Sequence, residues 1–170
     1  MKFSKVSFKL FFREYCNVNS ISFEQMSDDD FIFEVKQMYN DIKLPQRATK
    51  GSAGYDFFIP YTVNFHHKKD VTIPTGIRFQ CDEGKFLMCL PRSGLGMRHG
   101  MRLLNSAGII DEDFFGTASE GHIIAKFTCE EPFTLEKGTA MMQGIILPYF
   151  KVDDDKVETE RIGGFGSTGM

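Results

Sequence analysis

Tryptophan is absent from this chain of 170 residues, and cysteine is scarce, with four residues. The cysteines, Cys16, Cys81, Cys89 and Cys129, form no CxxC pair and have no histidine at zinc-finger spacing. The sequence therefore indicates neither a disulfide framework nor a structural metal site. We expect buried free thiols instead.

Long apolar runs and a basic excess are also missing. No apolar stretch reaches membrane-spanning length. The basic and then apolar start, MKFSKVSFKLFF, is interrupted by Lys9 and lacks a small-residue cleavage site, so we do not read it as a signal peptide. The net charge of −3 argues against a general nucleic-acid-binding protein. We expect a cytoplasmic protein that binds neither membranes nor nucleic acids.

Phenylalanine and glycine are abundant, with 18 and 16 residues. Several short apolar segments alternate with polar residues and are bounded by turn residues or charges, which is typical of an all-β domain. The expected strands are VSFKLFF from Val6, DVTIPTGIRFQ from Asp70, KFLMCLP from Lys85, GHIIAKFTC from Gly121 and AMMQGIILPYF from Ala140.

One segment fits two structures. In DDDFIFEVKQMYNDI, residues 28–42, a helical face would contain Phe31, Val35, Met38 and Ile42, whereas a strand face would contain Phe31, Phe33 and Val35. Periodicity alone does not decide between a helix and a strand here.

Five short stretches combine glycine with polar side chains suited to a phosphate ligand. They are KGSAGYDFF from Lys50, PRSGLG from Pro91, NSAGIIDEDFFG from Asn105, GTAMMQGII from Gly138 and GGFGSTG from Gly163. Each stretch alone is weak evidence for a phosphate site, because glycine-rich turns and flexible ends are common in proteins. Several other motifs are missing: no P-loop, GxSxG elbow or HExxH pair occurs in the sequence.

Taken in this order and spacing, the five stretches resemble the trimeric deoxyuridine triphosphate nucleotidohydrolase (dUTPase) family, which carries five such motifs. The resemblance covers residues 44 to 169. It implies a distorted jelly-roll β subunit and a homotrimer with active sites at subunit contacts. It also implies Mg²⁺-dependent hydrolysis of dUTP to dUMP and pyrophosphate, by attack of water on the α-phosphorus.

The resemblance implies roles for individual residues as well. Asp111 holds and activates the attacking water as a base. Asp56 reaches Mg²⁺ through water, because magnesium keeps several waters when it bridges phosphates. The implied substrate contacts are Arg92, Ser93, Gly94 and Gln143 with the phosphates, Asn105, Gly108 and Ile110 with uracil, Phe114 with the deoxyribose, and Arg161, Phe165, Gly166, Ser167 and Thr168 from the C-terminal segment.

The sequence departs from the family pattern in four places, one of which is Thr139 and Ala140, where the family usually has an Asp-Arg pair. Phe114 stands where the family usually has tyrosine, which keeps the ring that bars a 2′-hydroxyl. The spacing from Arg161 to Phe165 is one position shorter than usual, so we expect Arg161 to reach the phosphates by a different path. The segment TASEGH, residues 117–122, is longer than usual, and we expect it to lengthen a hairpin loop.

The expected organisation is a β domain at residues 26–160, with an extension before it and a lid after it. The extension, residues 1–25, matches nothing in the family, and Met26 is a second plausible start of the chain. Alternatively, VSFKLFF adds an edge strand to a sheet. The glycine-rich lid, residues 161–170, should stay mobile until ligand contacts offset its ordering entropy.

Two other functions stay open at this point. A dCTP deaminase, or a bifunctional deaminase and dUTPase of the same fold, would need a glutamate that acts on the pyrimidine and usually lacks the full aromatic Gly-Ser-Thr-Gly tail. A non-hydrolytic nucleotide-sensing module on the same scaffold would require loss of a catalytic position. Asp111, Gln143 and Ser93 are all present in this sequence.

Overall fold

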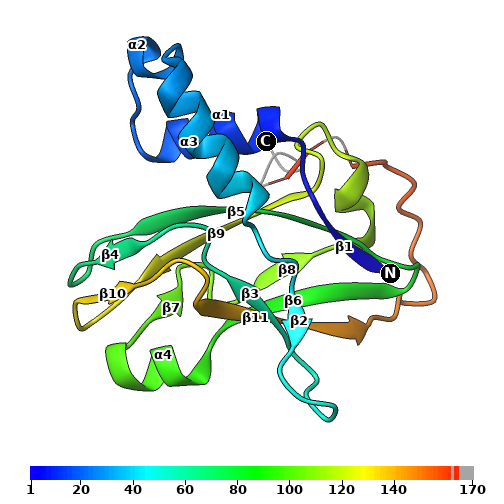
Figure 1. Ribbon diagram of the computed structural model, residues 1–170. Helices are drawn as coiled ribbons and strands as arrows, with labels where there is room; N and C mark the ends of the chain where they lie inside the picture. Colours follow the sequence, from blue (N-terminus) through cyan, green and yellow to red (C-terminus); the bar gives the residue numbers. More distant parts are fainter. Residues whose placement is uncertain (162, 165–170) are drawn as a thin grey trace.

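The computed structural model describes residues 1–161, 163 and 164, and in that part the strands form three antiparallel sheets. The first has the strand order β1-β5-β9-β7, the second β2-β3-β11-β6-β8, and the third is the pair β4-β10. Figure 1 shows the two larger sheets as layers, with the N-terminal helices over one corner. The strands are β1 (Lys2–Lys5), β2 (Gln46–Arg47), β3 (Tyr55–Phe58), β4 (Val63–Phe65), β5 (Val71–Gln80), β6 (Lys85–Pro91), β7 (Arg102–Leu103), β8 (Gly108–Ile110), β9 (His122–Thr128), β10 (Phe133–Leu135) and β11 (Ala140–Pro148).

The expected β architecture is confirmed from about residue 46 onward. We expected five segments to be strands, and four of them are strands in the structure: β5, β6, β9 and β11. Alternation explains β9, where Ile123, Ala125 and Phe127 are buried on one face and Lys126 is exposed on the other. These strands pair along their lengths and so fix the loops at their ends.

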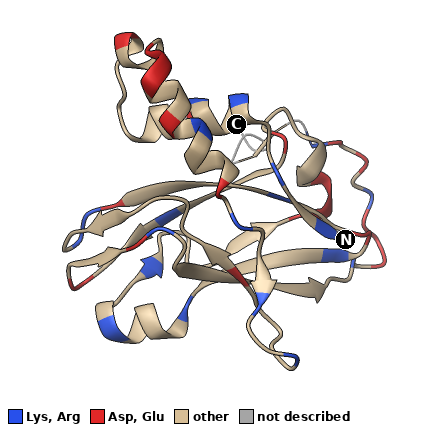
Figure 2. Ribbon diagram, viewed as in Figure 1, with Lys and Arg blue, Asp and Glu red and all other residues tan. Residues whose placement is uncertain are grey.

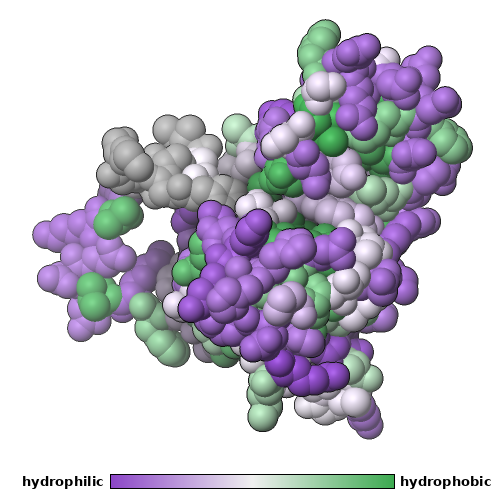
Figure 3. Space-filling view, turned by 90° about the vertical axis from the view of Figure 1, so that its left-hand side faces the viewer, coloured by the Kyte–Doolittle hydropathy of each residue, from purple (hydrophilic) through white to green (hydrophobic). Residues whose placement is uncertain are grey.

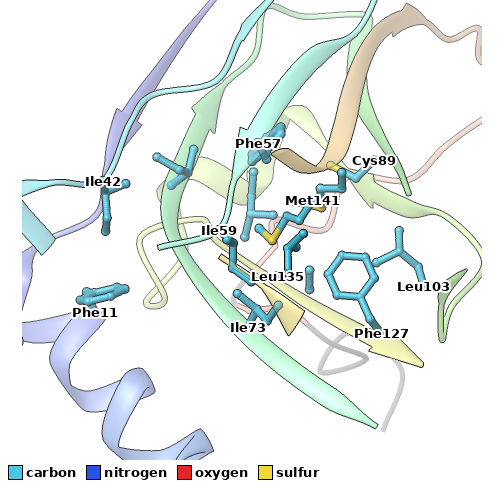
Figure 4. Packing of buried hydrophobic residues seen from close by; sticks show 14 of the residues in the cluster. Phe11, Ile42, Phe57, Ile59, Ile73, Cys89, Leu103, Phe127, Leu135 and Met141 are labelled. Carbon is cyan, nitrogen blue, oxygen red and sulfur yellow. The ribbon is translucent and has the colours of Figure 1, made fainter. Parts of the chain in front are cut away.

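The hydrophobic core lies between the layers and continues beneath the helices. Figure 4 shows Phe57, Ile59, Ile73 and Met141 in this cluster, and Phe11 lies at its helical side. All five side chains are at most 1% exposed. The N-terminal segment is therefore packed into the same core as the sheets.

The segment VSFKLFF is a helix and not the expected strand. Helix α1 spans Phe8–Val18 and begins at Ser7, whose side-chain oxygen accepts a hydrogen bond from the Leu10 N–H at 3.3 Å. A serine cap of this kind satisfies an amide that the first helical turn leaves unpaired. The apolar residues that follow recur at helical spacing, which buries Leu10, Phe11 and Cys16 together.

The ambiguous segment is also helical. Helix α2 spans Phe23–Met26, and helix α3 spans Asp29–Asn40 after Asp28, whose carboxylate accepts from the Phe31 N–H at 2.8 Å. Val35 is the buried residue of α3. The cap and the acidic first turn favour a helix, since negative charge is stabilising near a helix N-terminus.

Residues 2–5 provide the edge strand. Strand β1 pairs antiparallel with the second half of β5, from Lys2 opposite Gln80 to Lys5 opposite Ile77. The Lys5 ammonium also donates to the Tyr39 and Asn40 carbonyls at the end of α3. An added edge strand was one of the two alternatives for the N-terminal segment, although it lies before the residues that we expected to form it.

Charge and hydrophobic surface are unevenly distributed. Figure 2 shows acidic residues on α2 and α3, and basic residues on β7 and on α4 (Ser93–His99). On the face drawn in Figure 3, hydrophobic residues appear mostly as separate patches among hydrophilic ones. No helix in the described ranges is both long and apolar enough to cross a membrane. The four cysteines are free, and Cys81 is the one among them that is only partly buried.

Candidate functional site

The residues expected at the phosphates meet where β3, β6 and β11 lie side by side. Gln143 of β11 is the register partner of both Asp56 on β3 and Leu90 on β6. Arg92 follows β6, and its Nη1 donates to Asp56 Oδ2 at 3.0 Å. The Asp56 side chain is 13% exposed and that of Arg92 is 42% exposed, so the guanidinium stays accessible to a ligand.

A short helix begins directly beyond this ion pair. Ser93 and Gly94 form the first turn of α4, and Arg92 is its N-cap residue without a side-chain cap hydrogen bond. The stretch PRSGLG is thus the end of a strand followed by a helix, and Ser93 and Gly94 directly follow Arg92, which contacts Asp56. Three of the five sequence stretches contribute to this group, which we call the phosphate group: Asp56, Arg92, Ser93, Gly94 and Gln143.

A second group of expected residues forms around β8 and a 3₁₀ helix, η1 (Glu112–Gly116). Asp111 caps η1, and its side chain is 42% exposed. Its carboxylate accepts a hydrogen bond from Arg161 Nη2, while Asp113 Oδ1 accepts from Arg161 Nε at 2.7 Å. The guanidinium therefore bridges two carboxylates of the same turn. We call Asn105, Gly108, Ile110, Asp111 and Phe114 the base group.

A cavity of about 350 Å³ adjoins the base group. Asn105, Gly108, Ile110, Phe114 and Arg161 line it, together with apolar side chains from β6, β9 and β11. Small-molecule sites commonly begin at about 300 Å³ and are mostly apolar with a few polar groups. The cavity is therefore large enough for a small ligand of the size of a pyrimidine and its sugar.

Gly164 explains part of the glycine content of the C-terminal segment. It packs against the ring of Phe114, and a Cβ atom at this position would lie 2.4 Å from the ring carbon Cε2. Phe114 itself is 5% exposed. Only a residue without a side chain allows the backbone to approach the ring this closely.

Asp111 and Arg92 lie at opposite ends of β6. Ile110 of β8 is paired with Leu87, so Asp111 lies opposite Phe86, near the start of β6. Arg92 directly follows the last residue of β6. A strand rises about 3.3 Å per residue, so the six positions from Phe86 to Arg92 correspond to roughly 20 Å. One copy of the chain does not bring Asp111 to the phosphate group.

Four expected residues, Phe165, Gly166, Ser167 and Thr168, lie outside the residues that the structure describes, and so does most of the expected lid. Two neighbours of the base group were not expected from sequence. Asp113 shares Arg161 with Asp111, and His122 lines the cavity. An aspartate two residues from the expected base is a weak signal for the first, and no sequence signal indicated the second.

His122 is a buried histidine in the wall of the cavity. It is 1% exposed, and its Nε2 accepts a hydrogen bond from the Gly76 N–H at 2.9 Å, which assigns the ring proton to Nδ1. Nδ1 has no hydrogen-bond partner among the described residues. Burial lowers the pKa of His122 from 6.5 to about 4, with Glu120 opposing this shift and Arg13 adding to it.

This burial predicts acid sensitivity of the fold. The unfolded chain binds a proton at His122 near pH 6.5 and the folded chain only near pH 4, so stability falls as the pH drops through that window. We expect the free energy of unfolding to be about 2 kcal/mol smaller at pH 5 than at pH 7 from this residue. Urea denaturation at fixed protein concentration measures it. The variant His122→Gln should lose most of this difference, and an equal difference in both proteins would contradict the assignment.

The donor set around Asp56 is small. In the described part of the chain, no three His, Cys, Asp or Glu side chains gather as ligands of a metal ion. Asp56 offers one carboxylate, and Arg92 already contacts one of its oxygens. This set fits an ion that takes most of its ligands from phosphates and water, as Mg²⁺ does.

Comparisons with known proteins agree on one family. A family model described as dUTPase matches residues 40–169. The deoxyuridine 5′-triphosphate nucleotidohydrolase of Lactococcus lactis subsp. lactis is 39% identical over 145 residues, which covers 81% of this chain and 96% of the relative. That of a Hydrogenobaculum species is 37% identical over 142 residues and covers 80% and 96%.

Solved structures agree with the fold. The crystal structure of a dUTPase from Streptococcus mutans has a TM-score of 0.58 at 32% identity, and the match covers 65% of this chain and 88% of that one. A dUTPase from phage phi11 of S. aureus has a TM-score of 0.57 at 18% identity, with 69% and 90% covered. The second match supports the fold alone.

Proposed function

This chain belongs to the dUTPase family, and from that membership we propose that it hydrolyses dUTP to dUMP and pyrophosphate. The observation that carries the proposal is the position of Asp111, which directly follows the β8 residues that line a cavity of nucleoside size. A carboxylate there can serve as base for a water molecule that attacks the bound nucleotide. Curated relatives named for the same reaction support this assignment.

The cavity would hold uracil and deoxyribose. Asn105 offers both a hydrogen-bond donor and an acceptor, and the backbone of Gly108 and Ile110 offers further polar groups for the edge of the base. Such a site rejects cytosine by leaving buried polar groups unpaired. The ring of Phe114, fixed in the wall of the cavity, would bar the 2′-hydroxyl of a ribonucleotide.

Asp111 would accept a proton from the attacking water. The oxygen of that water forms the new bond to the α-phosphorus, the bond from phosphorus to the oxygen bridging to the β-phosphate breaks, and pyrophosphate leaves. Arg161 contacts the Asp111 carboxylate. The triphosphate carries several negative charges and would compete for this guanidinium, so Arg161 can pass from the base to the phosphates.

The phosphate group would hold the triphosphate. Arg92 is a cation with a planar fork that matches phosphate oxygens, and we place Gln143 near the α-phosphate with Ser93 and Gly94 beside it. Magnesium, held by the phosphates and through water by Asp56, would neutralise phosphate charge. A solved phage phi11 dUTPase coordinates a structural Mg(II) ion, which accords with a role for this metal in the family.

The distance between Asp111 and Arg92 supports a shared site. Since roughly 20 Å of β6 separates Asp111 from Arg92 in one chain, the phosphate group of one copy would have to meet the base group of another. We propose a homotrimer with three such composite sites, because a closed ring of identical contacts repeats the same site at every subunit boundary. The segment from Phe165 to Thr168 would then close over the nucleotide.

A cytoplasmic location completes the proposal. The four cysteines are free, and reducing compartments keep thiols unpaired.

One assay tests the function against its alternatives. The protein is mixed with Mg²⁺ and with dUTP, dCTP, dTTP or UTP in turn, and pyrophosphate and ammonia are measured. We expect pyrophosphate from dUTP, with kcat/KM above that of each other nucleotide by about 10²-fold or more. Ammonia from dCTP would instead indicate a deaminase. The absence of any product would indicate a non-hydrolytic binding module.

A further inference from the structure

A chain of contacts connects the N-terminal segment to the turn that carries the base group. Both oxygens of the Glu120 carboxylate accept hydrogen bonds from Ser7, from its N–H at 2.8 Å and from its hydroxyl at 2.6 Å. Glu120 also lies 3.9 Å from Arg78 Nη1. Arg78 Nη2 donates to the Phe115 carbonyl at 2.9 Å. Ser7, Glu120, Arg78 and Phe115 thus form one path, which we call the brace.

Each member of the brace is held in place by its surroundings. Ser7 is at once the N-cap of α1 and the residue after β1, which is paired with β5. Arg78 belongs to β5, and its guanidinium carbon lies 3.4 Å from the centroid of the Phe115 ring. Burial alone would raise the pKa of Glu120, but the hydrogen bonds from Ser7 and the charge of Arg78 keep it below the ordinary value.

The turn η1 is clamped from its other side by Gly121. A Cβ atom on Gly121 would lie 2.7 Å from the Phe115 Cα and 3.0 Å from the Phe114 carbonyl oxygen, and this glycine has a φ of +67°. The backbone of Gly121 therefore packs closely against the backbone of Phe114 and Phe115, with no room for a side chain. Arg78 and Gly121 fix Phe115 between them, while the Phe114 N–H donates to the Asp111 carbonyl at 3.2 Å at the start of the turn.

The brace reaches beyond the part of the chain that matches the family. Ser7 lies before residue 40, where the family match begins. Glu120 lies within the match, in the segment between η1 and β9. A residue from outside the family match therefore contacts the segment that directly follows η1.

We propose that Ser7, Glu120 and Arg78 are positioning residues for the reaction, and that the N-terminal segment is in this way part of the catalytic apparatus. They hold Phe115, and with it the neighbouring Phe114 ring and the Asp111 carboxylate, in the place that the sugar and the attacking water require. This inference rests on the proposed function, because it concerns the same base group.

The first experiment measures rate and sugar selectivity in Glu120→Ala. Loss of the carboxylate removes the partner of two Ser7 hydrogen bonds and frees Arg78, so η1 gains freedom. Displacement of a reacting group by about 1 Å can cost roughly 10²-fold in rate. We expect kcat/KM for dUTP to fall by roughly 10-fold to 10²-fold, and the preference for dUTP over UTP to fall by roughly tenfold, since both depend on η1. The matched control is Glu24→Ala, the same substitution at an exposed position of α2.

A double-mutant cycle separates positioning from general loss of stability. If Glu120 and Arg78 act through one path, the variant carrying both Glu120→Ala and Arg78→Ala should lose no more activity than the worse single variant. Fully additive losses with unchanged sugar selectivity would overturn the proposal. If Glu120→Ala does not fold, Ser7→Ala removes one of the hydrogen bonds and is subjected to the same selectivity measurement.

Amide hydrogen exchange keeps this inference separate from the proposed function. If the wild-type protein releases no pyrophosphate from dUTP, the proposed function fails while the brace can still be tested. We then expect amides of residues 112–117 in nucleotide-free Glu120→Ala to exchange at least about tenfold faster than in Glu24→Ala. Equal exchange in the two variants would overturn the brace. If wild type is active but Glu120→Ala keeps the rate and selectivity of Glu24→Ala, the brace fails and the proposed function stands.

Discussion

Replacing Asp111 by asparagine is expected to lower kcat for dUTP by roughly 10²-fold to 10⁴-fold, the range that a general base contributes. Asparagine has nearly the same size, but its amide cannot take a proton from water. It also leaves Arg161 without one of its two carboxylate partners. Steady-state pyrophosphate release with saturating dUTP and Mg²⁺ measures the loss. KM should change much less than kcat, because the carboxylate acts on the reacting water and not on the base or sugar.

The matched control for this substitution is Asp113→Asn. It removes a charge from the same turn and a hydrogen bond from the same arginine, at a carboxylate to which we assign no chemistry. A smaller loss, within about tenfold, is expected there because only the electrostatics of Arg161 change. Comparable losses in the two variants would mean that charge around Arg161 matters and that Asp111 is not the base.

Two inactive variants should restore each other when assembled together. In Asp111→Asn the phosphate group is intact, and in Arg92→Ala the base group is intact. If each site takes one group from each of two neighbouring copies, a trimer containing both variants has about one intact site in three. We therefore expect co-expressed, differently tagged variants, purified through both tags, to show about a third of wild-type kcat per chain.

The same tags on two copies of Asp111→Asn provide the control, which should stay inactive. Recovery of about half of the wild-type activity would indicate a dimer, because a mixed dimer has one intact site in two. No recovery from verified mixed assemblies would mean that one chain supplies both groups. That outcome would contradict the shared site while leaving dUTP hydrolysis itself to be judged by the nucleotide assay.

Local sequence patterns were sufficient for the central strands. β5, β6, β9 and β11 are flanked by charges, proline or turn residues, and their apolar residues fit a strand with at least one buried face. In VSFKLFF the alternation of Val6, Phe8, Leu10 and Phe12 predicts a strand, but the cap at Ser7 and the helical spacing of the buried residues produce helix α1. In α3, periodicity left two alternatives, and the aspartate cap together with burial of Val35 accounts for the helix.

The site could be assembled from sequence only as a set of residues. The resemblance selected Asp56, Arg92 and Gln143, and the register of β3, β6 and β11 brings them together. The resemblance could not indicate the ion pair between Arg161 and Asp111. These residues are 50 positions apart, and the path of the C-terminal segment brings them together. The brace was equally hidden, since Ser7 and Glu120 are separated by 113 positions.

The pairing of β1 with β5 affects how strongly molecules of this protein associate with one another. Without those four residues, the backbone of Ile77 to Gln80 would present open amides and carbonyls beside buried Ile77 and Phe79, which is a template for recruiting a strand from another molecule. With them, the outermost strand is only four residues long and carries the exposed charge of Lys2, which discourages pairing of one molecule with the next. The N-terminal strand therefore covers an edge that would otherwise favour fibre-like association.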